Sequence, residues 1–172
     1  GNGFHIPRRL QRRVRQNPYD ITIDQDFAAV IDACAALSST RTDTWINADI
    51  RQLYIALHKM GFAHSVEAWH EGDLVGGLYG VRLRAAFFGE SMFSRLTDAS
   101  KIALVHLVAR LRHGGFQLLD AQFTNEHLKQ FGMVDVPRIE FQQLLADALA
   151  AEADLHLAAP SLPMVTEMLA AG

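Results

Sequence analysis

The chain has 172 residues, of which 49% are hydrophobic and 20% charged, and its formal net charge is −3. This composition excludes a disordered chain, a collagen-like repeat and a transmembrane bundle, and the length suits one domain with a substantial core. We expect neither a membrane span nor a secretory signal, and the single cysteine, Cys34, cannot form an internal disulfide. The sequence therefore predicts one domain over residues 1–172 in the cytoplasm.

The first predicted element is a basic helix over residues 7–16. Pro7 suits the first position of a helix, and Leu10 and Val14 share one face. Arginines cover the rest of this helix: Arg8, Arg9, Arg12, Arg13 and Arg15. All five precede the first acidic residue, so the remaining chain holds 11 basic against 19 acidic residues. Such a helix is either a phosphate-binding ridge or a solvated terminal helix.

The next elements alternate between helix and strand. Residues 19–24 alternate apolar and polar as a half-buried strand does, and Asp24 is expected to cap a helix that runs from Phe27 to Cys34. A polar loop at 38–43 precedes a helix that begins at Asn47 or Asp49, covers 50–60 and ends at Gly61. Strands are then expected over 63–69 and 74–83, with a third starting at 85–90, and a tight turn at 71–73 joins the first two.

The second half predicts a crossover back to the sheet. A helix over 100–112 ends at Gly114 and Gly115, and a short buried strand follows at 116–121. Further helices are expected over 125–131 and 138–151, whereas the tail past Asp154 is weakly specified and is expected to pack loosely. This order predicts an α/β (α+β) fold with a mixed, mostly antiparallel sheet flanked by helices, which is the plan of an acetyltransferase-like (GNAT-type) domain.

The common chemical motifs are missing from the sequence. There is no phosphate-binding glycine loop, no nucleophile elbow and no Cys–Cys or His–Glu pair at metal-ligand spacing, so we expect no cofactor and no metal site. The turn at 95–100 lacks the glycines that would cradle the pyrophosphate of coenzyme A. Gly76, Gly77 and Gly80 lie within a predicted strand, where glycine marks either a close backbone approach or a bulge.

Two carboxylates follow buried strands. Glu90 comes after an apolar run, and Asp120 ends the short strand at 116–121. Gln122 lies two residues after Asp120, so the two side chains share a face if the strand continues. A carboxylate beside an amide can accept protons or hydrogen bonds from an incoming amine. The alternative is that both carboxylates are structural caps.

Several blocks of sequence together carry a family resemblance. They are Trp45-Ile46, His64–Trp69, Leu74–Val81, Phe88–Ser94, Ala99–Lys101, Leu119–Gln122 and His127-Leu128. From about residue 8 to about residue 150, the chain resembles the leucyl/phenylalanyl-tRNA–protein transferase family. The string Gly-Glu-Ser-Met-Phe-Ser, followed in order by Asp-x-Gln, is the most specific part of the match.

The resemblance implies an activity and its partners. The family transfers Leu or Phe, and less readily Met, from aminoacyl-tRNA to the N-terminal Arg or Lys of a protein, which marks that protein for degradation. The partners implied are therefore a charged tRNA and an acceptor protein, without a membrane or a metal. The implied fold is acetyltransferase-like, with tRNA in place of coenzyme A as the acyl donor.

The resemblance also assigns roles to single residues. Asp120 and Gln122 match the proposed proton-relay positions, Glu90 the position that holds substrate amino groups, and Trp45 the aromatic residue near the terminal adenosine. The pocket for the transferred side chain is implied to contain Leu78, Phe87, Met92, Leu104, Leu107, Leu111 and Leu119. The arginines between Arg8 and Arg15 match a basic helix that holds the tRNA acceptor stem.

The chain departs from the family in two ways. The small N-terminal domain of the family is expected to be absent, and Leu107 and Leu111 stand where some relatives have phenylalanine. One alternative is a non-catalytic or degenerate module that binds aminoacyl-tRNA or a peptide N-terminus, but the presence of Glu90, Asp120 and Gln122 favours an enzyme. A coenzyme A-dependent N-acetyltransferase is disfavoured by the turn at 95–100.

Overall fold

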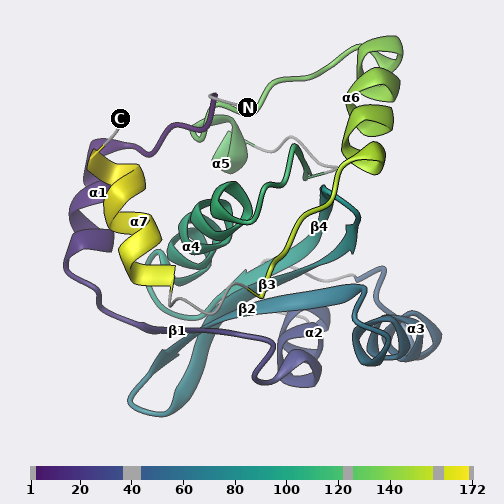
Figure 1. Ribbon diagram of the computed structural model, residues 1–172. Helices are drawn as coiled ribbons and strands as arrows, with labels where there is room; N and C mark the ends of the chain where they lie inside the picture. The colour runs from purple at the N-terminus through teal and green to yellow at the C-terminus, as the bar shows by residue number, and fades with distance from the viewer. Residues whose placement is uncertain (1–2, 37–43, 122–125, 157–160, 171–172) are drawn as a thin grey trace.

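The centre of the molecule is a five-stranded sheet in the order β1-β2-β3-β4-β5. The computed structural model describes residues 3–36, 44–121, 126–156 and 161–170 (Figure 1). The strands are β1 (Asp20–Ile23), β2 (Ala63–His70), β3 (Asp73–Leu83), β4 (Ala86–Ser94) and β5 (Leu118–Asp120). Strands β1 to β4 pair antiparallel, whereas β5 lies parallel to β4. The predicted mixed, mostly antiparallel sheet is confirmed.

Tight turns connect the antiparallel strands. Between β2 and β3, Glu71 and Gly72 both have positive φ, 53° and 88°. Two central residues of this kind make a hairpin turn whose twist matches that of the strands it joins. Arg84, with φ 54°, plays the corresponding part between β3 and β4. The turn predicted at 71–73 and the meander that it starts are therefore both present.

Helices cover both faces of the sheet (Figure 1). The central helix of one face is α4 (Ala99–His113), which packs against β2, β3 and β4, while α2 (Phe27–Ala35) and α3 (Ala48–Lys59) cover the other face. The remaining helices are α1 (Arg8–Arg15), α5 (Glu126–Lys129), α6 (Arg138–Ala150) and α7 (Ser161–Ala170). Among the described residues, no helix has the length and hydropathy needed to cross a membrane.

Helix α4 lies unusually close to the sheet because β3 carries a glycine beneath it. A Cβ atom added to Gly76 would lie 2.5 Å from the Cβ of Ala99, at the start of α4. Any larger residue would push the helix away from the sheet. At this position, the glycine marks the close approach of another segment, one of the two interpretations that the sequence left open.

The cap of α2 differs from the prediction. Asp26, not Asp24, is the N-cap, and its Oδ1 accepts a hydrogen bond of 2.9 Å from the amide of Ala29. Asp24 instead has φ 57° and turns its carboxylate to His64 and to the amide of Ser65. Burial would raise the pKa of Asp24, but these hydrogen bonds and the charges of His64 and His58 hold it below its ordinary value. The short side chain of an aspartate can either cap a helix that follows it or bind a distant partner, and Asp24 binds the distant partners His64 and Ser65.

The C-terminal tail corrects a second expectation. The tail does not pack loosely, because α7 lies against α4 and buries Met164 and Val165. Leu155, on the way to α7, is also buried in the main core. Within this interface, Nδ1 of His106 and Oγ of Ser161 form a hydrogen bond of 2.9 Å, and burial lowers the pKa of His106 to about 4. The alanine-rich sequence of the tail specified this helix weakly, and its packing against α4 stabilises it.

Most of the other boundaries follow the prediction closely. The basic helix expected at 7–16 is α1, and the helix at 50–60 is α3, which begins after Asn47 as one of the two expected caps. The helix at 125–131 is the shorter α5. The polar loop expected at 38–43 lies outside the described residues.

Candidate active site

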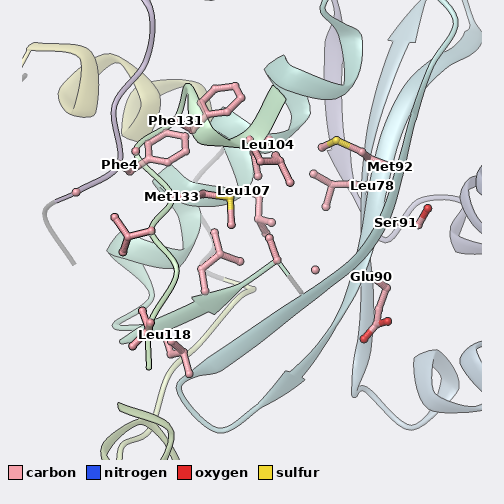
Figure 2. A pocket seen from close by; sticks show the side chains of 18 of the residues that line it. Phe4, Leu78, Glu90, Ser91, Met92, Leu104, Leu107, Leu118, Phe131 and Met133 are labelled. Carbon is pink, nitrogen blue, oxygen red and sulfur yellow. The ribbon is translucent and has the colours of Figure 1, made fainter. Parts of the chain in front are cut away.

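A cavity of about 660 Å³ opens where β4 and β5 part (Figure 2). Among the described residues, β5 pairs with β4 only from Ala86 to Phe88, whereas β4 continues to Ser94. The cavity is lined by β3, β4, α4, residues 117–121, the segment 128–136 and the N-terminal Gly3 and Phe4. A gap beside a sheet strand gives a ligand access to side chains from both faces of the sheet.

The inner wall of the cavity is apolar. Leu104 and Leu107 point into it from one face of α4, as a spacing of three residues requires. Leu78 on β3 and Met92 on β4 are register partners and lie beside them (Figure 2). Leu119 of β5 completes this wall. Five of the seven leucine, phenylalanine and methionine positions expected in a side-chain pocket therefore meet in one cavity.

The other two positions lie behind that wall. Phe87 and Leu111 belong to the same core as Leu78 and Leu107, but both are buried and do not line the cavity. The ring of Phe87 also explains Gly80, since a Cβ atom there would lie 2.5 Å from Phe87 Cε1. Phe87 and Leu111 support the residues that line the cavity.

Two aromatic residues that the sequence did not single out form another part of the wall. Phe4 and Phe131 stack with ring centroids 5.4 Å apart and an interplanar angle of 7°, and both line the cavity (Figure 2). The amide of His5 donates a hydrogen bond of 2.8 Å to the carbonyl of Phe131, which fixes the N-terminal segment against the loop after α5. No periodic pattern connects these residues, so only the fold could reveal the pair.

A β-bulge aims Glu90 away from the apolar wall. Tyr79 pairs with Ser91 and Gly80 with Gly89, so Glu90 is an extra residue on β4. Glu90 and Ser91 consequently point away from Leu78 and Met92 (Figure 2), and Glu90 reaches the hydroxyl of Tyr54 on α3. The bulge thus places a carboxylate at the rim of an apolar cavity. Gly80 therefore marks both a close approach, by the ring of Phe87, and a bulge in the pairing of β3 with β4.

Glu90 sits in a half-buried polar environment. Burial raises its pKa above the ordinary value, a hydrogen bond from the Tyr54 hydroxyl acts in the opposite direction, and the charge of Asp120 raises it further. Burial and the neighbouring Glu90 in turn raise the pKa of Tyr54. Asp120, at the end of β5, is opposite Phe88 in the register and is half-buried. The two carboxylates are therefore close enough to repel each other, which favours a cation between them.

An aromatic row stands beside the carboxylates. Tyr79 on β3 and Tyr54 on α3 meet edge to face at 5.2 Å, and Tyr54 meets Trp45 in the same way at 6.2 Å. Trp45 lines the cavity and is 43% exposed, so part of its ring is free to stack with a ligand. Gln122, the expected partner of Asp120, lies outside the described residues.

The arginine ridge begins a few residues from the cavity. Leu10 and Val14 anchor α1 in the core, while Arg8, Arg9, Arg12 and Arg15 are exposed. Arg13 is half-buried and its guanidinium lies 6.0 Å from the centre of the Tyr19 ring. Phe4 lines the cavity and Arg8 begins the helix, so the exposed charges lie next to its N-terminal wall.

Comparisons with known proteins agree on one family. The family model described as leucyl/phenylalanyl-tRNA protein transferase matches residues 1–146. A leucyl/phenylalanyl-tRNA–protein transferase of Phenylobacterium zucineum (strain HLK1) is 61% identical over 160 residues, covering 93% of this chain and 72% of that relative. One from Rhodopseudomonas palustris (strain TIE-1) is 56% identical over 169 residues, covering 98% and 75%.

A solved structure also matches, with a lower similarity. It is a ribosomal-protein-alanine N-acetyltransferase from Brucella melitensis biovar Abortus 2308, 17% identical, with a TM-score of 0.44 over 79% of this chain and 93% of that one.

Proposed function

The chain belongs to the leucyl/phenylalanyl-tRNA protein transferase family, and we propose that it moves leucine or phenylalanine, and less readily methionine, from charged tRNA to the N-terminal Arg or Lys of a protein. It is accordingly an aminoacyltransferase. The modified N-terminus would mark the acceptor protein for degradation. The observation that carries the proposal is an apolar cavity lined by Glu90, with the carboxylate of Asp120 close enough to raise the pKa of Glu90.

The apolar wall suits the side chain of the transferred amino acid. Leu78, Met92 and Leu104 offer only hydrocarbon and sulfur atoms, so they exclude a charged side chain, whose desolvation would remain uncompensated. A wall of this kind discriminates weakly between apolar side chains, since one methylene is worth about 1–3 kcal/mol. Acceptance of both leucine and phenylalanine follows from this chemistry.

The two carboxylates suit the acceptor. An N-terminal Arg or Lys carries a cationic side chain and an α-amino group whose pKa is about 8. Glu90 and Asp120, which repel each other in the free protein, would be relieved by such a cation. Glu90 would hold the acceptor, and Asp120, with Gln122 beside it by family resemblance, would take the proton.

The reaction needs alignment more than activation. The α-amino nitrogen forms an amide bond with the acyl carbon, and the ester C–O bond to the terminal ribose of the tRNA breaks. The proton that the attacking amine loses passes to the carboxylate and from there to the ribose oxygen, which leaves as a hydroxyl group. Because the ester is already activated, no covalent enzyme intermediate is required, and alignment alone can supply roughly 7–11 kcal/mol.

The remaining surfaces suit the tRNA. The exposed arginines of α1 match phosphate oxygens in geometry and charge. Trp45, with part of its ring exposed beside the carboxylates, would stack on the terminal adenosine. In this arrangement, the acceptor stem lies on α1 and the aminoacyl ester enters the cavity past Phe4.

A transfer assay tests the proposal directly. The full chain is incubated with leucyl-tRNA and with peptides that differ only in their first residue, Arg, Lys, Glu or Gly. We expect transfer to the Arg and Lys peptides alone, because only these place a cationic side chain beside Glu90 and Asp120. Equal transfer to the Glu peptide, or binding of charged tRNA without transfer to any peptide, would overturn the proposal.

A further inference from the structure

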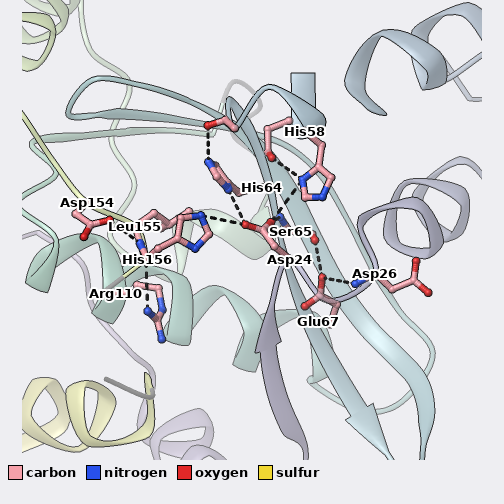
Figure 3. Close-up of polar contacts among 12 residues, drawn as sticks. Asp24, Asp26, His58, His64, Ser65, Glu67, Arg110, Asp154, Leu155 and His156 are labelled. Atoms are coloured by element: carbon pink, nitrogen blue, oxygen red, sulfur yellow. Dashed lines mark hydrogen bonds and ion pairs between the residues drawn. The ribbon is translucent and has the colours of Figure 1, made fainter. Parts of the chain in front are cut away.

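A second cluster of polar side chains lies outside the cavity, where three distant parts of the chain meet. Asp24 follows β1, His64 belongs to β2, and His156 lies between α6 and α7 (Figure 3). Asp24 Oδ2 lies 2.7 Å from His64 Nδ1 and 3.3 Å from His156 Nε2. One ligand atom from each residue lies within 4.8 Å of the others. None of these residues lines the cavity.

The hydrogen bonds of His64 bring two acceptor atoms, its own Nδ1 and a carboxylate oxygen of Asp24, face to face. His64 Nε2 lies 3.1 Å from the carbonyl oxygen of Gly61, which only accepts hydrogen bonds, so Nε2 carries the proton. In the neutral ring, Nδ1 then presents its lone pair to the carboxylate oxygen of Asp24, 2.7 Å away. Two acceptors at this distance require a positive group between them, which is either a proton or a metal ion.

His156 makes the metal ion the better explanation. Its Nε2 approaches the same Asp24 oxygen at 3.3 Å, close to the roughly 3.3 Å that separates two ligand atoms around a tetrahedral zinc ion. Protons would explain the cluster only if His64 and His156 each donated one to the same Asp24 oxygen, whereas a single metal ion binds all three atoms at once. The pair of His64 and Asp24 would open by about half an ångström to admit an ion.

The surroundings resemble those of a metal site. A ligating histidine usually donates its second N–H to a carbonyl, as His64 does to Gly61, and a ligating carboxylate is itself hydrogen-bonded. The amide of Ser65 donates a bond of 2.8 Å to Asp24 Oδ1, which leaves Oδ2 for the ion. The third nearby histidine, His58, lies 3.8 Å from Oδ1 and bonds to the carbonyl of Ala63, so it stands outside the ligand set.

We propose that Asp24, His64 and His156 bind one divalent transition-metal ion, and that this ion clamps the C-terminal segment to the sheet. Two imidazole nitrogens and one carboxylate oxygen match the preference of Zn²⁺. The side chain of His156 is 53% exposed, so the fourth position faces solvent and takes water. His156 also lies beyond residue 146, where the family match ends, so the site depends on a segment outside the family model.

Metal titration of the full chain tests the proposal. The protein is stripped with a chelator, and Zn²⁺ binding is followed by calorimetry, with Co²⁺ absorption in the visible range reporting a low-coordinate site. We expect one ion per chain and a thermal unfolding midpoint that rises with Zn²⁺, because the ion binds the folded state only. The absence of stoichiometric binding would mean that a proton, and not a metal ion, lies between His64 and Asp24, and it would overturn the proposal.

Variants separate the ion from the packing of the tail. Asp24→Asn keeps the backbone, since asparagine tolerates the positive φ of 57° at this position. Asp24→Asn and His156→Ala should each weaken Zn²⁺ binding by more than about 100-fold, beyond the loss that follows removal of an outer partner. His113→Ala is the matched control, because His113 also holds the C-terminal segment, through Glu167, but lies outside the cluster. Equal binding by His156→Ala and the wild type would contradict the assignment.

Discussion

Glu67 and Glu90 lie on neighbouring parts of one sheet face and are bound in very different ways. The carboxylate of Glu67 is fully buried and accepts hydrogen bonds from the hydroxyls of Thr22 and Ser65 and, at 3.4 Å, from the amide of Asp26. Glu90 sits half-buried at the rim of the cavity, where burial and Asp120 raise its pKa. Three hydrogen-bond donors surround the carboxylate of Glu67, whereas the nearby charge of Asp120 would favour the binding of a cation beside Glu90.

The comparison separates two kinds of motif residue. The block His64–Trp69 is as prominent in the sequence as Phe88–Ser94, yet its polar side chains bind one another: Trp69 Nε1 donates to Thr22, which donates to Glu67. A saturated network of this kind fixes the pairing of β1 and β2. The block around Glu90 instead interrupts regular pairing with a bulge. A mutation in the first should therefore act on folding, and one in the second on activity.

The largest expected effect belongs to Asp120. Asp120→Ala should lower turnover by about 10²–10⁴-fold, the range for loss of a general acid–base group, while leaving the affinity for charged tRNA nearly unchanged. Gln122→Ala should act similarly, and the double variant should fall far short of the product of the two losses. Single-turnover transfer to an Arg peptide measures this effect. A mere rise in KM for tRNA would contradict the assignment of Asp120.

The next effect tests the two glutamates against each other. Glu67→Ala should reduce the free energy of unfolding by about 1–3 kcal/mol, because buried hydroxyls lose their acceptor. Glu90→Ala should change it by less than about 1 kcal/mol, because burial already disfavours the charged carboxylate. Glu90→Ala should instead raise KM for the Arg peptide. Denaturant unfolding measures the stability of both variants, and steady-state kinetics measures KM. A large loss of stability in Glu90→Ala with an unchanged KM would contradict the prediction.

The arginine ridge should affect binding without affecting folding. Replacing the exposed Arg8, Arg9, Arg12 and Arg15 by Gln should flatten the dependence of log affinity for tRNA on log salt by about 0.7–0.9 per lost phosphate contact. Stability should hardly change, since exposed charges contribute little. Lys59→Gln, exposed at the end of α3, is the control. An unchanged salt slope would mean that α1 is only a solvated helix.

The smallest expected effect concerns Tyr54. Its hydroxyl donates to Glu90 and so opposes the increase in the pKa of that carboxyl, and Tyr54→Phe should therefore raise this pKa further. If the ionised carboxylate holds the acceptor as proposed, KM for the Arg peptide should rise as the pH falls through the pKa of Glu90. In the variant, this rise should begin at a higher pH. The pH profile of kcat/KM measures the shift, and a profile that does not move would exclude the positioning role.

Local patterns predicted the elements of the fold, whereas the family resemblance implied the residues of the apolar wall. Alternation and turn chemistry indicated β2, β3 and the turn between them, and helical spacing indicated the face of α4 that carries Leu104 and Leu107. Simple alternation failed at the bulge, since it would place Glu90 and Met92 on one face, whereas the extra residue places them on opposite faces. The stacked Phe4 and Phe131 depend on a contact between the N-terminal segment and the loop after α5, which are far apart in the sequence.

The short segment between Phe4 and Arg8 joins the aromatic wall of the cavity to the exposed arginines of α1. Four peptide units separate the aromatic wall from the first exposed arginine, a reach of at most about 14 Å. A shift of α1 toward the acceptor stem would draw on this tether and change how Phe4 stacks on Phe131. If α1 holds the acceptor stem as proposed, the place where the RNA binds and the wall of the side-chain pocket are then parts of one continuous segment.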